Sequence, residues 1–361
     1  MIRSVIRGAV SFLGLALLVE SVVGQPASPD KIVVLNRKDG STKTYEGTLK
    51  LSAAGLQILA PDGKLLATAA PADILKVSPG DLPGVDRNVL LNLLASEEKK
   101  TKADYQKARD GYLELQKKLS TAPDRTRRFV DFKVALMLTR VADESGDDEK
   151  WAEQAAEAVK AWTGFVTEYK TGWEVWLAAK TVTRLLAESN RFDDAARIWN
   201  RLTRKDADLP ADLRLEASLE EIDAQVRQRL YPSALETAKT LFAATPAGPT
   251  KDRLDIYQTA AKAGADANFV DGAKAIEAKI AATKDPVVRG TGFSMIGELL
   301  LAGGKPRDAM WAFLWVETVY NADKEAAFKA MCRLVEVFKA QNDEDRVKAY
   351  RDKIRRFRST L

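Results

Sequence analysis

Few side chains in this sequence could do chemistry, and the missing residue types decide most of what the chain can catalyse. The 361 residues include no histidine and a single cysteine, Cys332. The absence of histidine excludes Ser-His-Asp and Cys-His catalysis, histidine metal ligands and a histidine proton shuttle. One cysteine cannot form an internal disulfide or a CxxC metal site. Its apolar neighbours predict a buried, inert thiol, because structural cysteines behave as small hydrophobic side chains.

Two short motifs match elements of penicillin-binding enzymes but lack the context that catalysis requires. Residues 96–99 fit S-x-x-K and residues 170–172 spell K-T-G, yet the third element, S-D-N, is missing. Ser96 also begins a charged run, which indicates a solvated stretch rather than a buried nucleophile. The adjacent carboxylates at positions 193–194 and 220–221 would point in different directions on a helix. We therefore predict no catalytic residue, no metal site and no cofactor.

Composition and charge describe a folded protein with nearly balanced charge. Hydrophobic residues make up 46% of the chain and charged residues 30%, and 56 basic against 51 acidic side chains give a net charge of +5. Nucleic-acid binding favours a concentrated basic face, so this balance argues against a nucleic-acid partner. The length allows more than one unit, since domains usually hold roughly 100–200 residues.

The first residues have the features of a secretory signal peptide. Arg3 and Arg7 supply the positive end, residues 8–19 form an apolar core, and Val-Val-Gly at 22–24 precedes a cleavage site before Gln25. The core is shorter than the about 20 apolar residues that a membrane-spanning helix needs. We expect a signal peptide at residues 1–24, a linker at 25–30, and export to the periplasm or cell envelope.

Residues 31–77 predict a small all-β domain. Compact β runs alternate with two hairpin signals, Asp39-Gly40 and Asp62-Gly63. Four or five short strands in this length indicate a small barrel or curled sheet, and their order loosely resembles an SH3-like or Sm-like barrel. Tyr45 is the only aromatic residue of the segment, which argues against base stacking and favours a protein-contact module. A Pro/Gly-rich linker at residues 78–87 follows.

Residues 88–361 repeat a pattern of paired helices, seen best in residues 292–316. Apolar side chains recur there at the i, i+3, i+4, i+7 spacing of a helix face, on both sides of a Gly-Gly-Lys-Pro turn. The stretch resembles a tetratricopeptide (TPR) repeat, W-x2-L-G-x2-Y followed by A-x3-F and Pro, and Gly297, Ala309 and Phe313 match outright. The final Pro is missing. The resemblance implies a mainly α, TPR-like helical-hairpin solenoid behind a small all-β, barrel-like domain.

The register of the repeats is given by one position in the second helix of each pair, where paired helices approach closely. These positions lie 36 to 47 residues apart, longer than the 34 of a TPR, so true TPRs and looser α-hairpins both remain open. The seven residues are Ala108, Ala155, Ala195, Ala234, Ala273, Ala309 and Val347. The basic run at 345–361 is interpreted as a polar capping helix, with an attachment patch for an anionic surface as the alternative.

The tryptophans allow two interpretations. Trp173 and Trp176 are three residues apart and Trp311 and Trp315 four apart, so each pair can share a helix face. They could form an aromatic groove for a peptide or glycan, or pack between hairpins. We favour packing, because burying a tryptophan removes more apolar surface from water than almost any other side chain.

The resemblance to TPR proteins also implies a site. The first helix of each hairpin lines a concave groove in that family, and Lys180, Arg184, Ser294 and Glu298 would face it. A basic step at Lys180 and Arg184 could hold an acidic or C-terminal carboxylate group. We therefore predict an exported, non-enzymatic scaffold that binds a protein or peptide partner. The alternatives are a self-associating structural or assembly component of the envelope, and a carbohydrate- or peptidoglycan-associated protein at its periphery.

Overall fold

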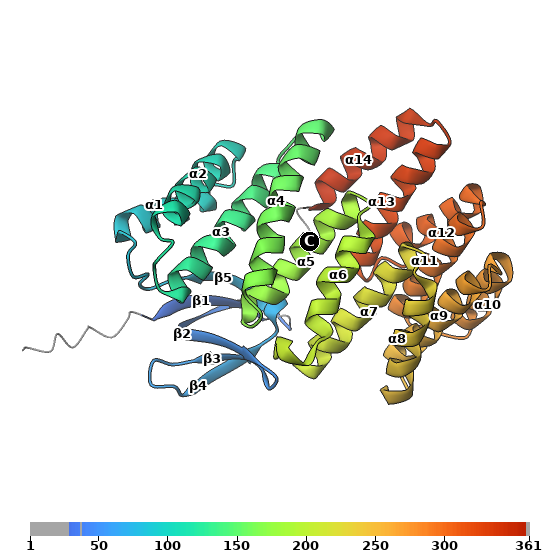
Figure 1. The fold of residues 1–361 in the computed structure, drawn as a ribbon, viewed down its shortest axis with the longest axis horizontal. Coiled ribbons are helices and arrows are strands. Elements are labelled where there is room, and N and C mark those ends of the chain that lie inside the picture. The colour runs from blue at the N-terminus through green and yellow to red at the C-terminus, as the bar shows by residue number, and fades with distance from the viewer. Residues whose placement is uncertain (1–28, 37, 359–361) are drawn as a thin grey trace, which may run out of the picture.

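The computed structural model describes residues 29–36 and 38–358, and within them a small antiparallel sheet precedes an array of paired helices (Figure 1). The predicted signal peptide at residues 1–24 lies outside the described residues. None of the helices in the described part of the chain combines the length and the hydropathy that crossing a bilayer requires.

The five strands of the described residues form one open sheet in the order β4-β3-β2-β1-β5. They are β1 (Asp30–Leu35), β2 (Thr42–Ser52), β3 (Gly55–Leu59), β4 (Leu65–Ala69) and β5 (Ile74–Ser78). All pairings are antiparallel, and β4 and β5 occupy opposite edges without meeting. The predicted all-β segment is confirmed, but the sheet is not closed into a barrel. Its apolar side chains Leu51 and Leu56 are buried in one cluster with the helices, so the array covers the face that a barrel would enclose.

Fourteen α-helices follow within the described residues and pack as consecutive hairpins, which confirms the predicted helical-hairpin solenoid. Their bounds are α1 (Arg87–Glu98), α2 (Lys102–Lys118), α3 (Asp124–Asp143), α4 (Asp148–Glu168), α5 (Trp173–Glu188), α6 (Phe192–Thr203), α7 (Ala211–Arg227), α8 (Tyr231–Ala244), α9 (Pro249–Ala265), α10 (Phe269–Ala281), α11 (Pro286–Ala302), α12 (Pro306–Thr318), α13 (Lys324–Ala340) and α14 (Glu344–Arg358). Short 3-10 helices lie at Pro71–Asp73 and Lys205–Ala207.

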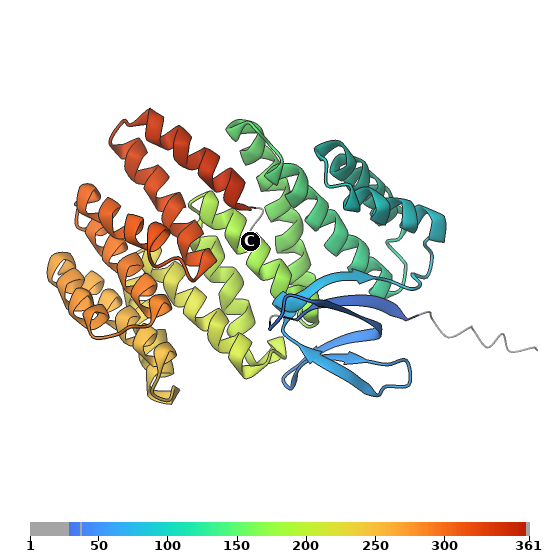
Figure 2. The same ribbon diagram turned by 180° about the vertical axis from the view of Figure 1, so that it is seen from behind.

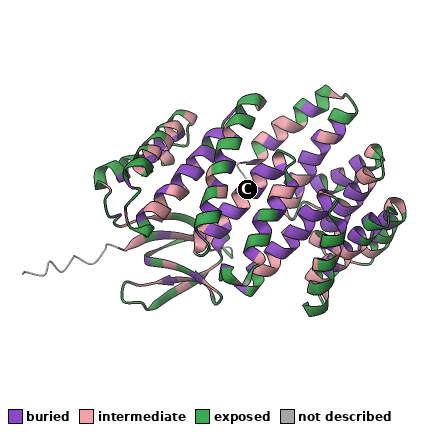
Figure 3. Ribbon diagram, viewed as in Figure 1, coloured by how far each residue is buried: buried purple, intermediate pink, exposed green. Residues whose placement is uncertain are grey.

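The predicted register is confirmed by burial. All seven register residues lie in even-numbered helices and are buried against a neighbouring helix. At the best-matching repeat, a Cβ added to Gly297 of α11 would lie 2.6 Å from the ring of Phe313 on α12. The two helices therefore approach closely only because glycine has no side chain there. Figure 3 shows the buried residues concentrated where helices face one another, with exposed residues on the outer surfaces.

The array curls until its last hairpin returns to its first half. Figures 1 and 2 both show α14 beside α4 and α5. Arg358, near the end of the described chain, forms an ion pair with Glu188 of α5, and Arg351 of α14 lies 2.7 Å from Asp148 at the start of α4. Basic side chains of the predicted capping helix thus form ion pairs with α4 and α5 and join the last hairpin to the first half of the solenoid.

The tryptophans differ in their burial. Trp162, Trp176 and Trp199 are among the largest fully buried side chains, as packing predicts. Trp311 and Trp315 on α12 are instead 59% and 46% exposed. Trp315 also stacks on Phe293 of α11, with the two ring centroids 5.8 Å apart. Cys332 is buried, in agreement with its prediction as a structural thiol.

Candidate functional site

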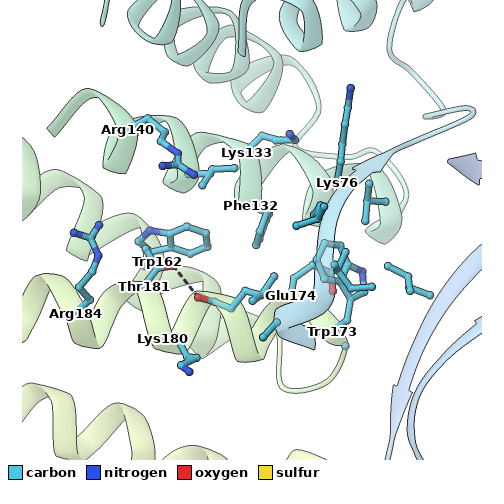
Figure 4. Close-up of a pocket in the computed structure, with 18 of the residues that line it drawn as sticks. Lys76, Phe132, Lys133, Arg140, Trp162, Trp173, Glu174, Lys180, Thr181 and Arg184 are labelled. Carbon is cyan, nitrogen blue, oxygen red and sulfur yellow. Dashed lines mark hydrogen bonds between the residues drawn. The ribbon is translucent and has the colours of Figure 1, made fainter. Parts of the chain in front are cut away.

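A large cavity opens on the inner side of the curled array, beside the sheet. It has a volume of about 1660 Å³, and we call it the concave cavity. Its walls come from β5, α3 and α5 (Figure 4). The starts of α9 and α13 complete them.

An aromatic cluster forms one wall of the concave cavity. The ring of the half-buried Phe132 on α3 lies 5.2 Å from that of Trp162 and 5.8 Å from that of Trp173. Trp162 is fixed in place, because its Nε1 donates a hydrogen bond to Thr139 Oγ1 at 2.8 Å. Figure 4 shows these rings gathered beside the strand that carries Lys76. Trp162 is only 1% exposed, so the aromatic surface that this wall offers to a bound group comes from the half-buried Phe132 and Trp173.

Lys180 and Arg184 both line the concave cavity, in keeping with the prediction for the inner face of α5. Both are already paired. Lys180 Nζ lies 2.7 Å from Glu325 and 3.4 Å from Glu216, and Arg184 donates two hydrogen bonds of 3.1 and 2.9 Å to Asp143. Burial alone would lower the pKa of Lys180, but the adjacent Glu325 and Glu216 outweigh it and raise that pKa above its usual range. These cations hold elements of the array together.

Ser294 and Glu298 do not line the concave cavity. They are 2% and 6% exposed and belong to a buried ion cluster between α7, α11 and α13. Arg227 donates hydrogen bonds to Ser294 Oγ at 2.8 Å and to Glu298 Oε1 at 2.7 Å, and Arg333 donates two more to Glu298. The structure thus brings Lys180 and Arg184 together in one site and places Ser294 and Glu298 in another.

The buried ion cluster also contains Asp223, Glu220 and Lys329. Lys329 Nζ of α13 donates to Glu220 at 2.6 Å and to Asp223 at 2.9 Å, both on α7. Burial alone would raise the pKa of Asp223, but Arg227 and Lys329 outweigh it and hold the pKa well below its usual range. The cluster therefore consists of charged groups that compensate one another, and Glu220 and Lys329 also line the concave cavity.

Arg140 is a cavity residue that the sequence did not single out. It is exposed and lies on α3 two turns beyond Phe132, and its guanidinium forms no hydrogen bond or ion pair with a residue that the structure describes. A cation without a carboxylate partner on a cavity wall is available to an acidic group of a ligand. No signal in the sequence distinguishes Arg140 from other helical arginines, because its availability depends on which carboxylates the fold places nearby.

A half-buried acidic group that lines the cavity is Glu174. It lies 3.0 Å from Arg128, whose guanidinium also stacks over the ring of Tyr169 at 5.1 Å. Burial raises the pKa of Glu174, and the charge of Arg128 opposes that rise. Pairing with Arg128 gives this carboxylate a structural contact at the start of α5.

The walls of the cavity can recognise a ligand by aromatic contact, apolar contact and ion pairing. Among the described residues, no group of three or more acidic or cysteine side chains is placed to hold a metal ion. A scan against protein-family models finds no matching family, and no curated protein matches the sequence. Function is therefore inferred from the concave cavity itself.

Proposed function

We propose that this protein is an exported, non-enzymatic scaffold that binds a segment of a partner protein in the concave cavity. The observation that carries the proposal is the cavity, with its volume of about 1660 Å³ and with walls of aromatic, apolar and charged side chains of both signs. Sites for small molecules usually measure about 300–1,000 Å³, so this one has room for a peptide segment. The unpaired Arg140 supplies a contact for an acidic group of that segment.

The repeat type and the location of the protein are part of the same proposal. Close approach of α11 and α12 at Gly297 and Phe313 is the packing that the TPR pattern encodes, and it supports assigning the hairpins to TPR-like repeats. The positive end and apolar core of residues 1–24 support export to the periplasm or envelope. A helical-repeat scaffold in that compartment would hold a partner protein in place.

The experiment is a quantitative pull-down from envelope extract with residues 25–361, followed by titration of the purified captured protein. Arg140→Glu reverses the available charge inside the cavity. Lys239→Glu makes the same change on the exposed side of α8, away from the cavity, and serves as the matched control. We expect Arg140→Glu to weaken binding by about tenfold or more, since charge reversal at an ion pair costs more than 1.4 kcal/mol. Equal binding by both variants would contradict the proposal.

Self-association is a second candidate function, favoured by a different surface. Trp311, Trp315 and Val319 are all about half exposed and follow one another at four-residue spacing around the end of α12. A contiguous apolar stripe of this kind is typical of contact surfaces. Sedimentation velocity across a concentration series tests it. A dimer that is lost in the double variant Trp311→Ser/Trp315→Ser would support self-association, and a wild-type monomer throughout would exclude it.

A further inference from the structure

One edge of the sheet opens into the concave cavity. β5 pairs with β1 along one side only, and Leu75, Lys76 and Val77 line the cavity. Beyond the pairing with β1, the main-chain atoms of residues 75–78 form no hydrogen bond with a residue that the structure describes. An edge strand presents a row of N–H and C=O groups that can pair with another extended chain.

The geometry of β5 turns an apolar side chain into the cavity. The pairing register with β1 shifts between Val33 and Val34, which leaves Leu75 without a partner residue on β1. A bulge of this kind redirects the side chain that it carries. Leu75 is 53% exposed although it lies inside a cavity wall. The edge therefore combines main-chain hydrogen-bonding groups with an uncovered leucine.

Two features of the surroundings favour the addition of a strand at this edge. A lysine on an edge strand usually opposes the addition of another strand. Here the ammonium group of Lys76 forms an ion pair with Glu98 of α1, which compensates its charge. The aromatic wall of Phe132 and Trp173 lies on the neighbouring side of the same cavity and can receive apolar side chains from an added strand (Figure 4).

The opposite edge of the sheet lacks this environment. β4 pairs only with β3, and its Leu65 is 49% exposed, similar to Leu75. None of residues 65–69 lines the concave cavity, and Figure 1 shows β4 at the side of the sheet that is farthest from α3. A strand added to β4 would meet solvent on both sides, whereas one added to β5 would also contact the helices.

We propose that the partner segment binds to β5 as an additional β-strand inside the concave cavity. The ligand is an extended peptide whose main chain pairs with β5 and whose alternate, apolar side chains contact Leu75 and the aromatic wall. Main-chain pairing gives such complexes their affinity, and pockets for alternate side chains give them specificity. A helical ligand would leave the N–H and C=O groups of the edge unpaired. This inference rests on the proposed function and specifies how the partner is held.

The first test uses a phage-displayed library of random peptides of about nine residues, selected on residues 25–361. The tightest binder is synthesised as a series in which each amide in turn is N-methylated. Only every second amide of an added strand points at β5, so we expect the Kd to rise about tenfold or more at alternate positions and to change little between them. A profile without this alternation would overturn strand addition. If the same peptide still loses affinity to Arg140→Glu, binding in the cavity stands and only its mode is wrong.

The second test locates the edge. Leu75→Lys places a charge beside β5, and Leu65→Lys makes the same change on β4, at a leucine of similar exposure. We expect the first variant to weaken peptide binding about tenfold and the second to leave it within about twofold, since an added lysine opposes pairing at its own edge. Thermal melts check that both fold. Loss with Leu65→Lys alone, or with neither variant, would overturn the proposal. A library that yields no binder would contradict the proposed function as well.

Discussion

Replacing Glu298 by glutamine is expected to lower the free energy of unfolding by about 3–5 kcal/mol. The Glu298 carboxylate accepts hydrogen bonds from Arg227 Nη1 at 2.7 Å and from Arg333 Nε and Nη2 at 2.8 and 2.9 Å. Arg227 keeps a second carboxylate, Asp223, in the variant. Arg333 would lose its carboxylate partner and keep neutral acceptors, namely the new amide oxygen at position 298, the side-chain oxygen of Asn190 and the main-chain oxygen of Arg227. Its charge would then be buried without a counter-ion, which is the costly state.

The assay is urea denaturation followed by circular dichroism, with the free energy extrapolated to water. Glu336→Gln is the matched control, because it breaks an exposed ion pair with Lys339 and should cost less than about 1 kcal/mol. The double variant Glu298→Leu/Arg333→Leu removes both partners and should recover most of the loss, since no isolated charge remains. If Glu298→Gln costs no more than Glu336→Gln, the cluster is solvated and the reasoning is refuted.

Three further predictions concern single positions. The pKa of Asp223 is depressed, because Arg227 and Lys329 outweigh the effect of burial. The Asp223 carboxylate therefore stabilises the fold above its unfolded pKa of about 3.9, and this contribution is lost as the pH falls. The difference in unfolding free energy between wild type and Asp223→Asn should shrink below about pH 4 in urea melts, and a constant difference would contradict this. Gly297→Ala should cost about 1–3 kcal/mol in the same assay, because the new Cβ would overlap the Phe313 ring; an unchanged midpoint would disprove that contact. Burial raises the pKa of the Cys332 thiol, so iodoacetamide should label it slowly in native protein and fast in guanidinium chloride, as mass spectrometry would show.

The helical array could be predicted from the sequence because its determinants are local. Small residues such as Ala108 and Ala195 mark the positions where the two helices of a hairpin touch, and they are buried as expected. Gly297 and Phe313 lie only sixteen residues apart, and the contact between them needs nothing from the rest of the chain. In such an array each repeat packs on the repeats that precede and follow it in the sequence. The spacing of apolar and small residues therefore indicates which faces are in contact.

The candidate site could be predicted only in part, because distant contacts decide it. Helical spacing placed Lys180 and Arg184 on the inner face of α5, where they lie. Their counter-ions come from other hairpins, Glu325 of α13 and Asp143 of α3, and no local pattern indicates that pairing. Helical spacing also predicted Glu298 in an open groove, but Arg227 and Arg333 from other hairpins enclose it. Periodicity shows which face of a helix is polar, but the curvature of the array decides whether that face meets water or another helix.

Closure of the array and the shape of the concave cavity depend on the same contacts. Lys329 reaches Glu220 and Asp223 in the buried ion cluster, and Lys329 and Glu220 also form part of the cavity wall. Lys180 joins α5 to α13 across that wall through Glu325. A partner segment bound in the cavity would contact both sides of this closure and therefore favour the folded, curled array. Ligand that binds only the folded state raises stability by about 2.7 kcal/mol at a hundred times its Kd. The binding peptide should therefore shift the urea midpoint of wild-type protein upward with concentration. Because Leu75→Lys is expected to weaken binding about tenfold, the same peptide concentration should stabilise that variant by only about 1.4 kcal/mol, roughly half of the wild-type effect.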